Sequence, residues 1–334
     1  MAHVPSAGSP ICLDPSGSAD LRLPSSPASP LPGSGGGLGA LSGASAMVFV
    51  GGSVAVSSVL AQAPLFSAQA VRYLIACLLL LICAKAFRRR VVMPKGTEWL
   101  WLLGVAMTGL LVFNVALVNG SEHAEPAVLG VAVACVPLVL AIIGPLLEGR
   151  RPSPLVLAAA LLVTCGAALV QGVGRSDAIG LVWAGVVLGC EAGFTLLAVP
   201  VLSRHGTWGV SIHATWMAAV IFAGVGVVGE GPLAVLQLRL EDLLAIGYLA
   251  VAVTAVAFVL WYFSVVRLGS GRAGLLTGVA PVAAAATGVA LGASTPRPLV
   301  WLGIAVVAAG LAVGLAGNRR PAPPLRRMRS ADQA

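Results

Sequence analysis

Long apolar runs separated by short polar stretches form the pattern of the chain from about residue 38 onward. Ten of these runs approach the roughly 20 residues that an α-helix needs to cross the hydrocarbon core of a bilayer. Their predicted bounds are 38–60, 66–86, 98–118, 124–146, 153–173, 178–201, 208–229, 242–266, 273–293 and 298–318. The alternating pattern of a membrane β-barrel is absent from the sequence. The pattern therefore predicts an all-α integral membrane protein with ten transmembrane helices, which satisfy their backbone hydrogen bonds internally.

The two terminal segments depart from this pattern. Residues 1–37 are rich in Pro, Ser and Gly, and a segment that cannot bury a core is expected to be disordered. The segment lacks the basic start and apolar middle of a cleaved signal peptide, and the sequence leaves open whether it belongs to the native protein. Residues 319–334 form a basic tail after the last apolar run.

Charged residues in the loops alternate in sign along the chain. The basic loops follow the even-numbered runs and carry Arg88, Arg89, Arg90, Lys95, Arg150, Arg151, Arg204, Arg267 and Arg272, and the tail adds five more arginines. The opposite loops carry Glu122, Glu125, Asp177, Glu230, Glu241 and Asp242, together with Arg175, Arg239 and Arg297. Because Lys and Arg accumulate in cytoplasmic loops, this alternation predicts that both termini are cytoplasmic. It also supports the count of ten, since one missed helix would invert every sign after it.

The composition agrees with a membrane protein. The 334 residues are 58% hydrophobic and only 10% charged, against about 25% charged residues in soluble domains. We assign the net charge of +8 to basic cytoplasmic loops and expect no nucleic-acid partner. Five of the six cysteines lie inside apolar runs and no CxxC pair occurs, so we expect neither disulfides nor a zinc site, and no cofactor.

The chain repeats itself at a shift of 144 positions. This shift aligns Gly130 with Gly274, Pro137 with Pro281, Pro152 with Pro296, Pro154 with Pro298, and Gly166 with Gly310, without a gap. Chance coincidence of common residues is the alternative explanation, but five matches at one shift favour two five-helix repeats, at 38–175 and 176–318. Because five is odd, the second repeat enters the membrane from the other side. Many secondary transporters are built from such inverted repeats, with the substrate site at mid-membrane between them.

Three stretches resemble a known family. "PLFSAQAVRYLIACLLLL" resembles its second helix, "NVALVNGSEHAEPAVLGVAVACVPLVLAIIGPLLEGRRPSP" its third and fourth, and "WYFSVVRLGSGRAGLLTGVAPVAAAATGVALGASTP" its eighth and ninth. On these segments the chain resembles an EamA-like member of the drug/metabolite transporter superfamily. The resemblance implies ten helices, cytoplasmic ends and transport of a small metabolite, and it favours export. The family often has a Gly-Glu pair at the end of the fourth helix of each repeat, but the first repeat here reads Glu148-Gly149-Arg150 and the second Gly292-Ala293-Ser294. That glutamate is therefore displaced or lost, and no role is transferred to it.

One acidic residue interrupts the apolar stretch "LVWAGVVLGCEAGFTLLAVPVL". Glu191 lies about 13 residues, or about 20 Å, into its predicted helix. A charge at that depth costs at least about 2.5–3.5 kcal/mol, and a short Glu side chain does not easily reach the membrane surface. Gly185, Gly189 and Gly193 form a small-residue stripe on which we expect another helix to pack, and Glu191 points away from that stripe. We therefore predict that Glu191 faces an aqueous cavity and exchanges a proton for a cationic group of the substrate; a protonated Glu bonded to a neighbouring helix is the alternative.

Other residues at membrane depth are candidates for the same cavity. Arg72 is predicted to face the bundle, where it would contact an anion or pair with Glu191, although it could also extend to the membrane surface. His213, with Trp216 on the same face, and Asn114 are candidate substrate contacts, with hydrogen bonds between helices as the structural alternative. Pro137 and Pro281 are predicted to kink helices that line the pathway or merely to shape packing. Trp261 and Tyr262 are explained by the aromatic belt.

The leading functional hypothesis is a secondary transporter that exports a small polar metabolite, either amino-acid-like or an organic cation, with protons coupled through Glu191. No Walker-type GxxxxGK[ST] loop occurs, so ATP is not the direct energy source. A passive pore or membrane scaffold is the alternative. A membrane-embedded enzyme is the least favoured hypothesis, because four histidines do not supply a clustered catalytic constellation. The expected partners are a small-molecule substrate, the lipid bilayer and protons, and a homodimer is left open.

Overall fold

The computed structural model describes residues 35–292 and 296–316, and this part of the chain is helical apart from loops and a single β-bridge between Ala124 and Ser176. The predicted N-terminal tail and the basic C-terminal tail lie outside the described residues, except for residues 35–37 at the start of the first helix. The protein is an all-α integral membrane protein. Within the described part, nine helical segments are long and apolar enough to cross a membrane, and a shorter apolar helix, Gly36–Gly52, occupies the first predicted run.

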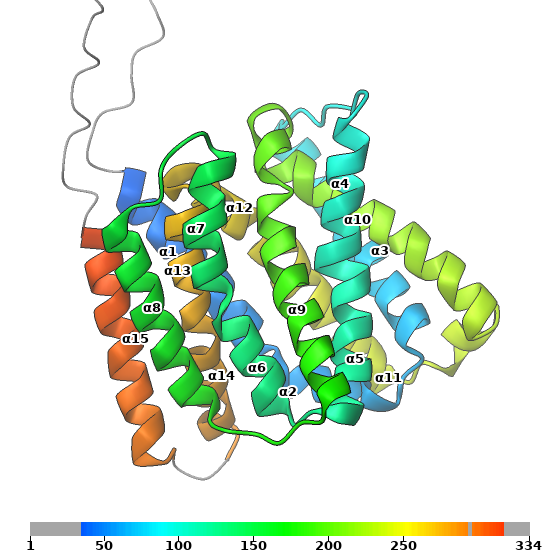
Figure 1. The fold of residues 1–334 in the computed structure, drawn as a ribbon. Coiled ribbons are helices and arrows are strands. Elements are labelled where there is room, and N and C mark those ends of the chain that lie inside the picture. Colours follow the sequence, from blue (N-terminus) through cyan, green and yellow to red (C-terminus); the bar gives the residue numbers. More distant parts are fainter. Residues whose placement is uncertain (1–34, 293–295, 317–334) are drawn as a thin grey trace, which may run out of the picture. The chain divides into compact units, whose positions relative to one another are not determined.

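The first half of the chain forms five helical segments (Figure 1). These are α1 (Gly35–Gly52) with the short helices α2 (Val54–Ser57) and η1 (Ser58–Gln62); α3 (Leu65–Ala86); α4 (Glu98–Ala106), η2 (Met107–Val112) and α5 (Phe113–His123); α6 (Pro126–Ala134) and α7 (Val136–Leu147); and α8 (Pro154–Gln171). Pro126 and Pro154 each occupy the first helical position, where the missing N–H has no intrahelical partner to lose.

The second half repeats this order. Its segments are α9 (Ala178–Leu196); α10 (Val199–Gly229), followed by the short η3 (Ala234–Gln237); α11 (Leu240–Tyr248), η4 (Leu249–Val256) and α12 (Ala257–Leu268); α13 (Ser270–Leu275), η5 (Leu276–Gly278) and α14 (Val279–Ala290); and α15 (Pro298–Ala316). The loop predicted at 202–207 is wrong, because the chain is helical from Val199 and turns sharply at Gly206. Gly206 has a φ of 65°, a backbone conformation that favours glycine.

Equivalent helices of the two halves pack in equivalent ways. Helix α3 packs on α10 and α8 packs on α15, while α1 packs on α12 and α14 much as α9 packs on α5 and α6. The α8–α15 crossing, visible at the left of Figure 1, is close enough to require glycine. A Cβ atom on Gly166 would lie 2.7 Å from the carbonyl oxygen of Gly303, and a Cβ on Gly310 would lie 3.0 Å from the Val163 nitrogen. Gly166 and Gly310, two of the glycines that revealed the repeat, therefore both lie in this interface, each against the backbone of the opposite helix.

The third and eighth segments share an unusual feature. Each changes from an α-helix to a wider π-helix near its middle, at η2 in the first repeat and at η4 in the second. A shift of 144 places Met107–Val112 on residues 251–256, within η4. Such π-helical stretches occur frequently at functional sites. Their symmetric placement directs attention to the space between these two segments.

We name the two ends of the bundle by their charges. The arginine-rich end, at the top of Figure 1, carries Arg150, Arg204 and Arg272, and the acidic end carries Glu125 and Asp177. Each end has its own ion pairs: Glu98 bonds Arg204 and His205 at the arginine-rich end, and Glu125 bonds Arg175 at the acidic end. All of these ion pairs lie at helix ends, and none of them involves the charged residues Arg72 and Glu191 of the bundle interior.

Candidate functional site

A cavity of about 130 Å³ lies in the middle of the bundle. Its walls come from α1, α3, η2, α5, α9, η4 and α12, so both repeats and both π-helices contribute. The lining residues are Met47, Val50, Arg72, Tyr73, Gly109, Leu110, Phe113, Asn114, Glu191, Phe194, Val253, Ala257, Phe258 and Trp261. Three of the predicted site residues, Glu191, Arg72 and Asn114, therefore line one cavity although they are far apart in sequence.

Glu191 reaches this cavity from α9, a helix whose first turn is capped by the Asp177 carboxylate, which accepts a hydrogen bond from the Gly180 N–H at 2.7 Å. The Glu191 side chain is half-buried, and it forms no hydrogen bond or ion pair with any residue that the structure describes. A carboxyl group held in a largely apolar cavity without a protein partner is available to a ligand or to a proton.

The predicted packing stripe on α9 is wrong. A Cβ atom on Gly185 or Gly189 would meet nothing within 4 Å, and only Gly193 approaches a neighbour, at 3.2 Å from the Thr108 side chain. Helix α9 instead packs through Ala184 and Val187, which join a buried cluster with residues of α5 and α6. The four-residue spacing of the glycines identified a common face correctly, but it could not show that another face of the helix meets the neighbours.

Arg72 is hydrogen-bonded at the cavity wall. Its Nε donates to Oγ1 of Thr254 on η4 at 3.0 Å, and an Nη donates to the Gln69 side chain at 3.4 Å. The guanidinium also lies 5.2 Å from the centre of the Tyr73 ring. In the part of the chain that the structure describes, Arg72 forms no ion pair with Glu191. The cavity thus presents one acidic and one basic group that are not neutralised by each other.

Asn114 connects two walls of the cavity. Its amide donates to the Tyr73 hydroxyl at 3.1 Å and to the Leu110 carbonyl at 2.6 Å. Leu110 belongs to η2, where the wider helix leaves carbonyl groups with altered partners. On the opposite wall the Thr254 hydroxyl donates to the Leu249 carbonyl, five residues earlier, at 3.1 Å. The two π-helices therefore place the polar groups that position Arg72 and Asn114.

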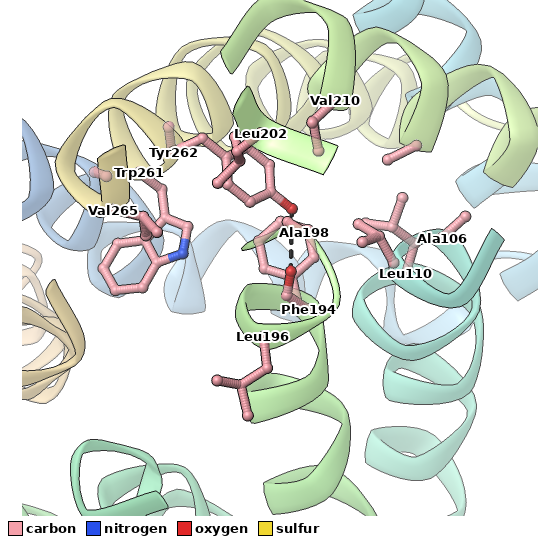
Figure 2. Close-up of a cluster of buried hydrophobic side chains, with 14 of the residues drawn as sticks. Ala106, Leu110, Phe194, Leu196, Ala198, Leu202, Val210, Trp261, Tyr262 and Val265 are labelled. Carbon is pink, nitrogen blue, oxygen red and sulfur yellow. Dashed lines mark hydrogen bonds between the residues drawn. The ribbon is translucent and has the colours of Figure 1, made fainter. Parts of the chain in front are cut away.

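Aromatic rings close the cavity on the arginine-rich side. Phe194 contacts Phe258, with ring centres 4.9 Å apart, and Tyr262, at 5.2 Å. The Trp261 indole donates to Oγ1 of Thr195 at 3.0 Å, and Figure 2 shows the Tyr262 hydroxyl bonded to the Phe194 carbonyl. Trp261 is 4% exposed and Tyr262 is fully buried, so the aromatic-belt interpretation is wrong for both. Their hydrogen bonds to α9 hold them in the interior.

His213 and Trp216 lie elsewhere on α10 and are not among the residues that line this cavity. The His213 Nε2 is 2.9 Å from the Val92 carbonyl, and the Trp216 indole donates to His213 Nδ1 at 3.1 Å. The His205 ring stacks edge-on against His213 at 5.4 Å. These contacts match the structural alternative for His213, and a substrate role for His213 and Trp216 stays a prediction.

The two symmetric prolines are buried but do not line the cavity. Pro137 lies in the first turn of α7, directly after the helix is interrupted at Cys135. Pro281 lies in α14, directly after the 3₁₀ segment η5. Both helices are therefore interrupted just before the proline, where its missing N–H and its ring disfavour a continuous α-helix. A role for these prolines in the pathway stays a prediction.

Sequence reasoning missed a contact between the repeats at the arginine-rich end. Oε1 of Glu148, just after α7, accepts hydrogen bonds from the Ser270 N–H at 2.8 Å and the Ser270 hydroxyl at 2.6 Å, and Arg150 pairs with the same carboxylate. Gly144 lies directly against Ser270, leaving no room for a side chain. Burial by itself raises the pKa of Glu148, but the bonds from Ser270 and Arg150 outweigh it and hold the pKa below its ordinary value.

This contact makes the two ends of the bundle unequal. Helix α7 packs closely on α13 at the arginine-rich end, whereas their continuations toward the acidic end, α6 and α14, are not a packed pair. The fourth and ninth segments therefore pack on each other mainly at the arginine-rich end. No sequence motif marked the contact, because Glu148 and Ser270 lie 122 positions apart.

Comparisons with known proteins agree with this architecture. A model of the EamA-like transporter family matches the chain twice, over residues 37–171 and 178–315. The "Uncharacterized transporter YetK" of Bacillus subtilis (strain 168) is 27% identical over 290 residues, which cover 83% of this chain and 87% of that protein. A chain of a solved structure described as "Crystal structure of protein" superposes with a TM-score of 0.73 at 20% identity, over 85% of this chain and 99% of its own. That likeness supports the fold alone.

Proposed function

The chain belongs to the EamA-like transporter family and is a multi-pass membrane transporter, and on that premise we propose that it exports a small polar metabolite from the cell, exchanging substrate for protons at Glu191. The substrate carries a positively charged group, as an amino-acid-like zwitterion or an organic cation does. Transport is driven by the proton gradient and not by ATP.

The observation that carries this proposal is the unpaired state of the two charges in the cavity. Glu191 has no hydrogen-bond or ion-pair partner among the described residues, while Arg72 is bonded to Thr254 and Gln69 instead of to Glu191. Charged groups at membrane depth are costly and usually paired. A zwitterion would satisfy both at once, with its amine on Glu191 and its carboxylate on Arg72. A cation without a carboxylate would use Glu191 and the faces of Phe258 and Trp261.

Orientation follows from the loop charges. Because basic loops stay in the cytoplasm, we assign the arginine-rich end to the cytoplasmic side, with both termini there. The aromatic residues Phe194, Phe258 and Trp261 then lie on the cytoplasmic side of the cavity and close it there. In this state a cation leaves Glu191 for the exterior, and an external proton takes its place. The protonated carboxyl is then neutral, which lowers the cost of enclosing it again.

Glu191→Gln tests the coupling. Candidate substrates are first identified by comparing metabolites released by cells with and without the protein. Native and Glu191→Gln proteins are then reconstituted in vesicles, and substrate accumulation is measured against its gradient at several imposed pH differences. Glu241→Gln is the matched control, because Glu241 is exposed at the acidic end and is not among the residues that line the cavity.

The expected result is that native protein and Glu241→Gln accumulate substrate in response to the pH gradient, whereas Glu191→Gln inserts normally but loses the pH response. Native-like rates and pH dependence in Glu191→Gln would refute coupling through Glu191. A native protein that only equilibrates the substrate across the membrane would be a passive pore, and the secondary-transporter proposal would then fail.

A further inference from the structure

Thr254 lies directly behind the wall of the central cavity. It is fully buried in η4 and is not among the residues that line the cavity, although its neighbour Val253 is. Its hydroxyl oxygen accepts the hydrogen bond from the Arg72 Nε–H at 3.0 Å. Thr254 therefore acts on the cavity through Arg72 and not by touching a ligand.

The π-helix decides the direction of the Thr254 hydroxyl. This hydroxyl donates to the Leu249 carbonyl, five residues earlier, at 3.1 Å, a carbonyl that a π-helix brings within reach. The hydroxyls of Thr108 and Thr277 instead donate to carbonyls four and three residues earlier, as is usual for threonine in a helix. Because the Thr254 proton is bonded to Leu249, its oxygen meets Arg72 as an acceptor.

The anchored Arg72 side chain keeps its charge and several free donors. A guanidinium has five N–H donors, of which Thr254 takes the Nε–H and Gln69 takes one Nη–H, so three are left. Both partners are neutral, and among the described residues no carboxylate pairs with Arg72. A planar group fixed at Nε presents its remaining donors as a fork, which matches the geometry of a carboxylate.

We propose that Thr254 is a positioning residue that determines specificity: it holds Arg72 in place for the carboxylate of the substrate, so that the cavity prefers an amino-acid zwitterion to a cation without an anionic group. This role rests on the proposed function, in which Glu191 holds the positive group. A simple cation would neutralise Glu191 and leave the Arg72 charge without a partner, which is costly at membrane depth. A zwitterion neutralises both charges, provided that the guanidinium stays in the plane that the carboxylate requires.

Specificity is tested by binding to the full-length protein, purified in a neutral detergent. The probes are the standard L-amino acids, and each one that binds is paired with the amine that lacks its carboxylate. The readout is the thermal unfolding midpoint as a function of probe concentration, which gives an apparent affinity. Binding is measured without a pH gradient. A native pH response of transport in Glu191→Gln would therefore refute proton coupling and leave this comparison intact.

Four variants separate positioning from support of the fold. Thr254→Val removes the hydroxyl at nearly constant volume, and Thr254→Ser keeps it. Thr254→Ala provides the same comparison if Val prevents folding. Thr164→Val is the matched control, because Thr164 is a buried threonine of α8 that does not line the cavity, and its hydroxyl has no hydrogen-bond partner among the described residues.

We expect the native protein to bind an amino acid more tightly than the matching amine. In Thr254→Val the affinity for the amino acid should fall about three- to tenfold, the change expected for one lost hydrogen bond, and the affinity for the amine should not change. Thr254→Ser and Thr164→Val should behave like the native protein. An equal change for both probes in Thr254→Val, or no change for either, would overturn the proposal. A native protein that binds none of the amino acids, or binds the amines as tightly, would overturn it as well.

Discussion

Removing the Glu148 side chain should release the arginine-rich ends of α7 and α13 from each other. Glu148→Ala deletes the carboxylate that accepts the Ser270 N–H and hydroxyl at 2.8 and 2.6 Å. It also removes the partner of Arg150. The Glu148 side chain is 16% exposed, so water replaces only part of what is lost. Helix α13 keeps its glycine-mediated packing on α7 at Gly144, and the fold itself should survive.

The size of the effect follows from the number of bonds. A hydrogen bond to a charged group contributes about 1.5–3 kcal/mol. Two such bonds, partly replaced by water, give a loss of about 2–4 kcal/mol, which corresponds to about 30- to 1,000-fold in the ratio of joined to separated states. If the equilibrium favours the joined state of α7 and α13 by a few kcal/mol, Glu148→Ala should therefore make the joined and separated states about equally populated, or make the separated state predominate.

The assay is a distance measurement between spin labels placed on Leu147 and Val266, two exposed positions near the ends of α7 and α12, in a background without native cysteines. Glu148→Ala should broaden the distance distribution and add a longer component, whereas Glu241→Ala at the acidic end should leave it unchanged. Acidification offers an independent check. Because the Glu148 pKa is depressed, its contribution is present above the ordinary value of 4.5 and is lost as the pH falls through the lower pKa of the folded state.

An unchanged distribution in Glu148→Ala would refute the argument that Glu148 joins the repeats. A longer component in both variants would instead show a general loosening of the bundle, and it would refute the assignment of the effect to the Ser270 bonds.

Three further results are expected. Gly166→Val should lower the free energy of unfolding by about 1–3 kcal/mol, because the new Cβ would collide with the Gly303 carbonyl. Gly185→Val should have little effect, because its Cβ would meet nothing within 4 Å, and equal effects of the two variants would contradict the close crossing. Arg72→Leu should reach normal abundance but lose transport of a carboxylate-bearing substrate, and normal transport would leave Arg72 a structural role only. Reporter fusions after Arg90 should read cytoplasmic and those after Glu122 exterior; the same side for both would invalidate the assigned orientation.

The sequence by itself determined the class and the plan of the fold. Apolar runs near 20 residues specify membrane-spanning helices, because backbone N–H and C=O groups in hydrocarbon must form their hydrogen bonds within the same helix. This assignment therefore requires no knowledge of contacts between distant parts of the chain. The count of ten segments and the repeat at a shift of 144 were likewise readable, and the structure confirms the all-helical, two-repeat architecture. The predicted helix boundary was wrong near Gly206. There a single residue with a positive φ makes a sharp turn between two helical stretches, where the sequence predicted a loop.

Three of the predicted site residues, Glu191, Arg72 and Asn114, line the central cavity, whereas His213 and Trp216 do not, and the geometry of the cavity was not predictable. The depth of Glu191 and Arg72 within their runs marked them as costly residues, and depth is a local property. The arrangement of α3, α5 and α9 decides whether those charges pair. The same arrangement brings Asn114 to the cavity that they line. Helical periodicity specifies which residues share a face, but it does not specify the neighbour of that face.

Only the tertiary structure decided the contacts on which the mechanism depends. Trp261 and Tyr262 look like interface anchors in the sequence, yet hydrogen bonds to α9 bury both. Glu148 looks like a displaced motif residue, yet it joins the repeats through Ser270, 122 positions away. Local composition cannot encode such pairings, because the energy of a buried hydrogen bond depends on the distance and direction between two groups that the chain brings together only when the helices pack.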